Sequence, residues 1–168
     1  FTGLQYQSMA PDVFTDSELE YVQDHLKIMS GFYGMLRPFD GIVHYRLGMG
    51  DRAQVGGTKN LYQFWGAQLA DDLYRQDQLV INLASQEYSK VIQPYATGER
   101  QLVTCRFVEI INGRPKQKAT LAKMARGNMV RFLARENATT LDQVRQFNLG
   151  YRYDPALSTT DLITFVKK

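Results

Sequence analysis

Hydrophobic residues first recur at helical spacing near the start of the chain. Thr15 and Glu18 have the spacing of a capping box, in which each side chain binds a free backbone N–H near the start of a helix. Leu19, Val22, Leu26 and Met29 follow on one helical face. The pattern therefore predicts a helix that ends at Met29, where Ser30-Gly31 stops it.

Four later stretches also predict helices. Asn60 has the spacing to cap a helix whose buried face is Leu61, Trp65, Leu69 and Leu73. Ser85 is placed to cap a short helix that extends through Val91, and Thr140 to cap another. A longer helix is predicted over 121–133 from the recurrence of Leu121, Met124, Ala125, Met129, Phe132 and Leu133.

The strands are predicted from continuous or β-rich runs. Residues 79–84 are apolar and bounded by turn residues, and residues 101–111 are rich in Val, Ile, Thr and Phe. Asn112-Gly113 is the strongest short hairpin signal and predicts a returning strand over 114–119. The pattern also predicts a closing pair of strands over 151–153 and 162–166. We therefore predict an α+β (mixed α/β) fold, a single domain over 1–168 with a mixed β-sheet and flanking helices.

The composition fits a globular protein of ordinary kind. Hydrophobic residues make up 44% and charged residues 22%, which argues against disorder. No apolar run approaches the roughly 20 residues of a membrane helix, and the start does not resemble a signal peptide. Cys105 is the single cysteine, which is typical of the reducing cytoplasm. Because no Met stands at position 1, we expect the sequence to begin inside a longer protein.

Positive charge is concentrated in one stretch, residues 110–135, which we call the basic segment. The rest of the chain carries more acids (17) than bases (13), whereas the basic segment has no acid. Its seven bases are Arg114, Lys116, Lys118, Lys123, Arg126, Arg131 and Arg135. Such a focused positive field favours an anionic partner over an evenly solvated surface.

Several motifs resemble the YaaA peroxide stress resistance family, and they occur in family order over nearly the whole chain. They are the stretches 1–4, 25–38, 45–50, 61–66, 80–85 and 122–132, among them His25-Leu-Lys-Ile-Met-Ser-Gly-Phe-Tyr-Gly34 and Ala122-Lys-Met-Ala-Arg-Gly-Asn128. The N-terminal portion of the family, which opens with Ser-Pro-Ala-Lys, is absent. The chain therefore resembles the C-terminal two thirds of the family's full length.

The resemblance implies a cytoplasmic bacterial protein that protects cells from hydrogen peroxide, limits free iron and binds DNA. It also implies a mixed fold with a positively charged cleft and a helix–hairpin–helix-like element. Any site built partly from the missing portion would be incomplete in this chain.

Clustered bases provide sequence-independent affinity for DNA, because each neutralised phosphate releases condensed counterions. We expect the main contacts from Lys118, Lys123, Arg126 and Arg131, with Arg37 and Arg46 across the cleft. Lys123 and Arg126 are expected on the polar side of their helix. The plainer alternatives are a solvated helix face and, for Arg46, an ion pair with Asp51.

Gly31 and Gly34 flank a turn that loosely resembles a helix–hairpin–helix. In such a motif, backbone N–H groups of a glycine-bearing turn and of the next helix start bind a phosphate. The alternative is that Gly31 only ends a helix and Gly34 begins the next turn.

A second candidate site is a possible pocket at Asn82, Ser85, Tyr88 and Lys90, where a buried strand runs into a helix. It supports the alternative function, an enzyme acting on a nucleotide or phosphorylated small molecule. No nearby His would activate Ser85, so we expect it to be a helix cap instead of a nucleophile.

A third function class is a protein-interaction module with an acidic partner. No metal or cofactor is expected, because His25, His44 and Cys105 are too isolated for a metal site. The expected partner is duplex or branched DNA, with no membrane, and a monomer is favoured.

Overall fold

The computed structural model describes all residues from 1 to 168 and divides into two compact units. Unit 1 comprises residues 1–25 and 103–168, and unit 2 comprises residues 26–102. The strand β4 (Gln101–Ile111) runs through the boundary between them. The mixed α/β class is confirmed.

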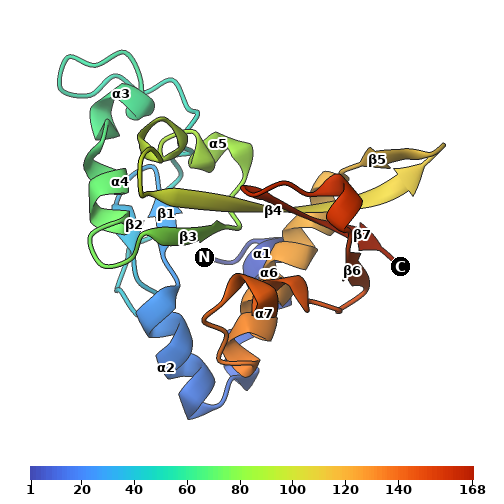
Figure 1. Cartoon of the computed structure of the whole chain (residues 1–168). Coiled ribbons are helices and arrows are strands. Elements are labelled where there is room, and N and C mark those ends of the chain that lie inside the picture. The colour runs from blue at the N-terminus through green and yellow to red at the C-terminus, as the bar shows by residue number, and fades with distance from the viewer. The chain divides into compact units, whose positions relative to one another are not determined.

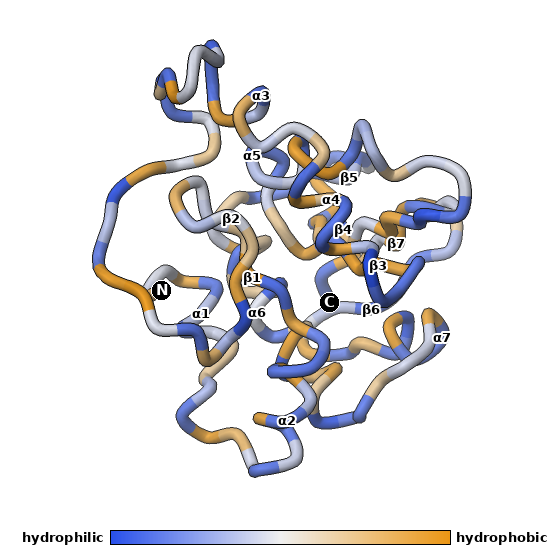
Figure 2. The backbone as a smooth tube through the Cα atoms, turned by 90° about the vertical axis from the view of Figure 1, so that its left-hand side faces the viewer, coloured by the Kyte–Doolittle hydropathy of each residue, from blue (hydrophilic) through white to orange (hydrophobic).

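Unit 1 holds most of the sheet and the longest helix (Figure 1). Its helix α2 is mostly hydrophilic (Figure 2), and Val22 is its one buried residue. Its helices are α1 (Leu4–Met9), α2 (Asp16–His25), α6 (Ala119–Arg135) and α7 (Leu141–Arg145), with short 3₁₀ turns at Pro11–Val13 and Pro155–Leu157. Besides β4 its strands are β5 (Arg114–Lys116), β6 (Tyr151–Tyr153) and β7 (Leu162–Lys167).

The sheet is mixed, with the strand order β3-β4-β7-β6 and with β5 paired to β4. β4 and β7 are parallel, with Cys105 opposite Ile163, whereas β6 is antiparallel to β7 and β5 is antiparallel to β4. An aromatic core lies on this sheet, where the Phe107 and Phe165 rings stack 5.3 Å apart and Phe147 meets both edge-on. These rings are almost completely buried, so they anchor unit 1.

Helix α1 packs against α6 at a glycine. A Cβ atom at Gly127 would lie 2.0 Å from the carbonyl oxygen of Gln5 and 2.8 Å from the backbone nitrogen of Met9. Only glycine permits this approach of the two backbones. The Gly127 position, in the middle of a long helix, is thus explained by close packing and not by helix propensity.

Unit 2 contains a second core, around Met49, Leu61, Leu69, Tyr74 and Ile92. Its elements are β1 (Ile28–Ser30), β2 (Gly34–Leu36), α3 (Leu61–Trp65), α4 (Gln68–Leu73), β3 (Leu79–Asn82), α5 (Gln86–Ser89) and a 3₁₀ turn at Gln93–Tyr95. The predicted helix after Asn60 is interrupted, because Gly66 has a φ of 49° and ends α3. The strand β3 pairs at the beginning of β4, where the Gln101 N–H donates to the Gln78 carbonyl over 2.7 Å.

The prediction that the first helix extends to Met29 was wrong. α2 ends at His25, and Ile28–Ser30 pairs instead with Gly34–Leu36 in an antiparallel hairpin. Ser30, Gly34 and Leu36 are buried in this hairpin. Leu26 and Met29 fit a helical period, but the hydrogen bonds between β1 and β2 and the burial of Ser30 and Leu36 favour strands.

The predicted capping boxes and the predicted hairpin turn are confirmed. Both capping boxes form: the Thr15 N–H donates to Glu18 over 2.8 Å, and Thr140 and Gln143 satisfy each other reciprocally. Asn112 and Gly113 both have positive φ, at 52° and 71°, as a two-residue hairpin turn requires. Short-range hydrogen-bonding chemistry was therefore the most dependable part of the sequence pattern.

Candidate nucleic-acid interface

The basic segment forms the β4–β5 hairpin and the helix α6, so all of it lies in unit 1. Four of its bases are exposed and form no ion pair: Arg114, Lys116, Lys123 and Arg131. The hydrogen-bonded hairpin and the 17-residue helix hold their backbones in regular structure. This part of the chain therefore presents uncompensated positive charge on ordered elements.

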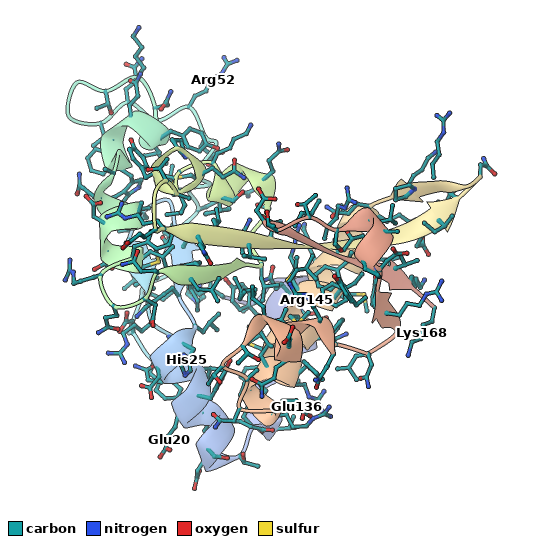
Figure 3. The ribbon with its side chains drawn as sticks, in the orientation of Figure 1. Glu20, His25, Arg52, Glu136, Arg145 and Lys168 are labelled. Carbon is teal, nitrogen blue, oxygen red and sulfur yellow. The ribbon has the colours of Figure 1, made fainter.

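Two further bases of the segment are exposed but paired. Lys118 Nζ lies 2.7 Å from a Glu109 carboxylate oxygen, and Lys167 Nζ lies 3.0 Å from the other. The hydrogen bonds from Lys118 and then Lys167 hold the pKa of Glu109 below its usual range. At the end of α6, near Glu136 in Figure 3, Arg135 Nε lies 3.2 Å from Oε1 of Glu136. Lys118 is thus a weaker phosphate ligand than its exposure alone suggests.

The expected place of Arg126 on the polar side of the helix was wrong. Arg126 is only 9% exposed, and its buried Nε has no hydrogen-bond partner. Burial lowers the pKa of its guanidinium. The neighbours Ala122, Met129 and Val130 are buried as well, so Arg126 belongs to the inward face of α6, which the charge pattern alone did not reveal. Arg126 therefore offers little surface to a phosphate, and the prediction that it contacts DNA stays a prediction.

Lys123 and Arg131 are one helical turn before and one turn after Gly127, where α1 crosses α6. Both lie on the side of α6 that α1 crosses, because residues four apart share a face. Helix α1 packs against α6 (Figure 1). The two exposed bases therefore lie one turn to either side of the Gly127 crossing.

The other two predicted arginines lie in unit 2. Arg37 and Arg46 are both exposed. The alternative ion pair between Arg46 and Asp51 does not form, and the Asp51 carboxylate accepts the backbone N–H of Gly48 over 2.7 Å. The prediction that Arg37 and Arg46 contact DNA stays a prediction.

The turn from Gly31 to Gly34 is not part of a helix–hairpin–helix, since it joins two strands. The N–H groups of Phe32 and Tyr33 already donate to Ser30 Oγ, over 3.2 and 2.9 Å. The glycines serve packing: a Cβ at Gly34 would lie 2.8 Å from the Trp65 ring, and one at Gly31 would lie 2.9 Å from the Leu47 carbonyl. The backbone donors that a phosphate would need are occupied.

The residues of the possible pocket have different environments. Asn82 is buried and its side chain accepts the Ala84 N–H over 3.0 Å, which satisfies part of its hydrogen-bonding capacity. Ser85 occupies the N-cap position of α5 as expected, although its side chain makes no capping hydrogen bond. Burial, and then the Glu87 carboxylate, raises the pKa of Tyr88, whereas Lys90 is exposed. The pocket stays a prediction.

Comparison with known proteins decides the family. The family model described as "Peroxide stress protein YaaA" matches residues 1–157. The chain belongs to the YaaA peroxide stress protein family. The motifs that carried the resemblance lie in both units.

Curated relatives carry the name "UPF0246 protein". One from Limosilactobacillus reuteri strain DSM 20016 is 60% identical over 166 residues, which cover 98% of this chain and 67% of the relative. Those from Pediococcus pentosaceus and Lactiplantibacillus plantarum are 48% and 49% identical, each over 99% of this chain and 67% of their own length. This YaaA-family chain thus spans about two thirds of these relatives, as the resemblance implied.

Three further observations bear on the chemistry of this family member. No group of three or more His, Cys, Asp or Glu side chains lies together as a metal site would require. Cys105 is buried in β4, and burial raises the pKa of its thiol to about 12. None of the helices is long and apolar enough to cross a membrane.

Sequence patterns missed a hydrogen-bond network in unit 2. Glu87 accepts the Gly50 N–H over 3.0 Å through its carboxylate, and its carbonyl accepts the Tyr62 hydroxyl over 2.8 Å. Ser30 shares a short hydrogen bond with the Tyr45 hydroxyl. The available signal was the glycine content of 48–50, which indicates close approach but does not name the partner.

Proposed function

We propose that this YaaA-family protein binds DNA without sequence specificity, through the exposed bases of the basic segment, as part of the bacterial response to hydrogen peroxide. The observation that carries the proposal is the charge of residues 110–135, which include seven bases and no acid. Four of those bases are exposed without an ion pair.

The physical argument is electrostatic. A phosphate backbone holds condensed counterions, and each base that neutralises a phosphate releases them, which favours binding by any sequence alike. Contacts to phosphates position a protein but carry no sequence information. In this proposal Arg114, Lys116, Lys123 and Arg131 are the main contacts, Lys118 contributes less because of Glu109, and Arg126 makes no direct contact.

The test is a double charge reversal, Lys123→Glu with Arg131→Glu. Both side chains are exposed, so the substitutions leave the core intact. We expect the affinity for a 30-base-pair duplex, measured by fluorescence anisotropy at low salt, to fall by about tenfold or more. The melting temperature should change by only a few degrees, because exposed substitutions cost within about 0.5 kcal/mol.

A control separates local contacts from net charge. Arg75 and Arg152 are exposed and lie outside the basic segment, so Arg75→Glu with Arg152→Glu changes the net charge equally. This control should keep most of the affinity. Equal loss in both double variants would mean that overall charge, and not the basic segment, governs binding.

The remaining parts of the proposal come from the family resemblance. They are a cytoplasmic location and a contribution to limiting free iron. We also propose, apart from the resemblance, that the protein is a monomer and that it binds duplex or branched DNA. We assign no iron-binding residues to the chain. The alternative, an enzyme acting on a nucleotide or phosphorylated small molecule near Asn82 and Ser85, would be supported by saturable binding of such a compound that Asn82→Ala abolishes.

A further inference from the structure

The end of the β4–β5 hairpin, residues 109–118, is an exposed ribbon of unit 1, whereas the earlier part of β4 is buried in the core. Figure 1 shows β5 and the end of β4 extending beyond the other strands of their sheet. All of residues 112–118 are exposed, including every residue of β5. The tight Asn112-Gly113 turn and the ladder from Glu109–Lys116 to Ile111–Arg114 keep this ribbon ordered. An ordered ribbon with so little burial contributes little to the core.

The two faces of the ribbon differ in chemistry. Residues directly opposite each other in an antiparallel pair share a face. One face carries Arg114 and Lys116, opposite Ile111 and Glu109. The other face pairs Ile110 with Pro115, both exposed, with Ile110 at 48%. The ribbon therefore has a basic face and an uncovered apolar face.

We propose that the β4–β5 hairpin is a DNA-binding arm that enters the minor groove, with Arg114 and Lys116 on the phosphates and Ile110 and Pro115 wedged against a base-pair step. This inference rests on the proposed DNA binding and adds the groove, the contact surface and a bend in the DNA.

The minor groove fits the side chains that the arm offers. The base pairs present nearly the same donors and acceptors in this groove, so a protein bound there has little means of reading the sequence. This agrees with binding that is not sequence-specific. Its negative potential attracts arginine and lysine. Ile and Pro are among the apolar wedges that partly unstack base steps and kink the duplex. Pro115 also has no backbone N–H, so this edge strand has one donor fewer to leave unsatisfied.

The charge of the surroundings supports the same occupant. Glu109 is the only acid on the ribbon, and Lys118 and Lys167 pair with it. The neighbouring helix α6 adds the exposed Lys123 and Arg131. An uncovered apolar face flanked by uncompensated bases suits a polyanion that has apolar base edges, and DNA is such a ligand.

Bending and affinity can be measured separately in the full chain. A 30-base-pair duplex with a donor and an acceptor dye at its ends reports the bend, and anisotropy reports the affinity. The wedge variant, Ile110→Thr with Pro115→Ala, keeps a β-branched residue in the strand. We expect it to lose most of the change in dye separation while its affinity falls by less than about threefold. Val13→Thr, at an exposed apolar residue elsewhere in unit 1, should bend DNA as the parent protein does.

The charge variant, Arg114→Glu with Lys116→Glu, should lower the affinity by about tenfold or more and reduce the salt slope by about two. Netropsin, which occupies the minor groove, should displace the protein, whereas methyl green in the major groove should not. Circular dichroism and melting should match the parent protein for both variants, because the changed residues are exposed.

The outcomes distinguish the inference from the proposed function. The proposed role of the hairpin is wrong if the parent protein binds DNA but does not bend it and is not displaced by netropsin. It is also wrong if both hairpin variants behave like the parent protein. In either case DNA binding itself still holds. If the parent protein binds no DNA at any salt, the proposed function itself fails.

Discussion

The basic segment in unit 1 and the turn-and-loop region 31–51 in unit 2 were both expected to contact DNA, but they differ in how many of the expected donors are already occupied. In the basic segment, four exposed bases have no ion pair. In the other region, backbone N–H groups that a phosphate would need already donate to Ser30, Asp51 and Glu87. Both regions carry glycine or charge that suggests anion binding.

The difference shows which sequence signals can be trusted for a binding site. A long stretch without acids leaves its bases few partners nearby, so most of them stay free. A glycine-rich stretch does not in the same way leave its backbone N–H groups without partners. Gly34 and Gly31 lie close to Trp65 and to the 47–48 backbone, and their small size serves that packing. A glycine-rich turn is therefore evidence for close approach of something, which here is the protein itself.

The largest change in stability is expected at Arg126, and Lys123, three residues earlier on α6, provides the comparison. Arg126→Glu places a carboxylate in a buried site with no partner and should lower the free energy of unfolding by about 3 kcal/mol or more. Lys123→Glu, at an exposed site, should change it by within about 0.5 kcal/mol. Urea denaturation followed by circular dichroism measures both.

Arg126→Met is the control for size, because it keeps the volume and removes the charge. It should be far less destabilising than Arg126→Glu. Equal stability of Arg126→Glu and Lys123→Glu would contradict the burial of Arg126 and return it to the list of phosphate contacts.

An intermediate effect is expected at Gly34. A Cβ atom there would meet the Trp65 ring at 2.8 Å, and the φ of +80° disfavours any other residue. Gly34→Val should therefore lower the free energy of unfolding by about 2–3 kcal/mol. DNA affinity per folded molecule should be unchanged, because the N–H groups of this turn bind Ser30. A tenfold loss of affinity at full stability would instead reinstate a phosphate site at the turn.

The smallest effect on stability is expected at Cys105, where the prediction concerns the reactivity of a thiol buried in β4. Because burial raises the pKa of the thiol to about 12, only roughly one molecule in ten thousand carries a thiolate at pH 8. Iodoacetamide or hydrogen peroxide should modify the native protein at least about a hundredfold more slowly than the urea-unfolded protein, measured by intact mass.

The same burial gives a pH dependence. The folded pKa is raised, so the contribution of the protonated thiol is fully present below about pH 8.5 and is lost as the pH rises toward 12. Cys105→Ala should remove this part of the alkaline destabilisation. Rapid oxidation of Cys105 in the native protein would make it a candidate peroxide sensor.

Much of the fold could be predicted from the sequence where the signals were local. The bounds of β4 follow from a run of β-branched and aromatic residues, and the Asn112-Gly113 turn and both capping boxes follow from hydrogen bonds within a few residues. The end of α2 and the burial of Arg126 could not, because both depend on what packs against the residue. Helical spacing puts Lys123 and Arg126 on adjacent positions of one surface, but only the tertiary structure shows where the buried face ends.

The central claim, that free bases of one segment bind DNA by counterion release, is tested most directly by the salt dependence of affinity. We expect the logarithm of the affinity for duplex DNA to fall linearly with the logarithm of the salt concentration. Four to six phosphate contacts predict a slope between about −3.6 and −5.4, equal for random and defined duplexes of one length. In the Lys123→Glu, Arg131→Glu variant the slope should be shallower by about two. An affinity that is unchanged between low and physiological salt would contradict the claim.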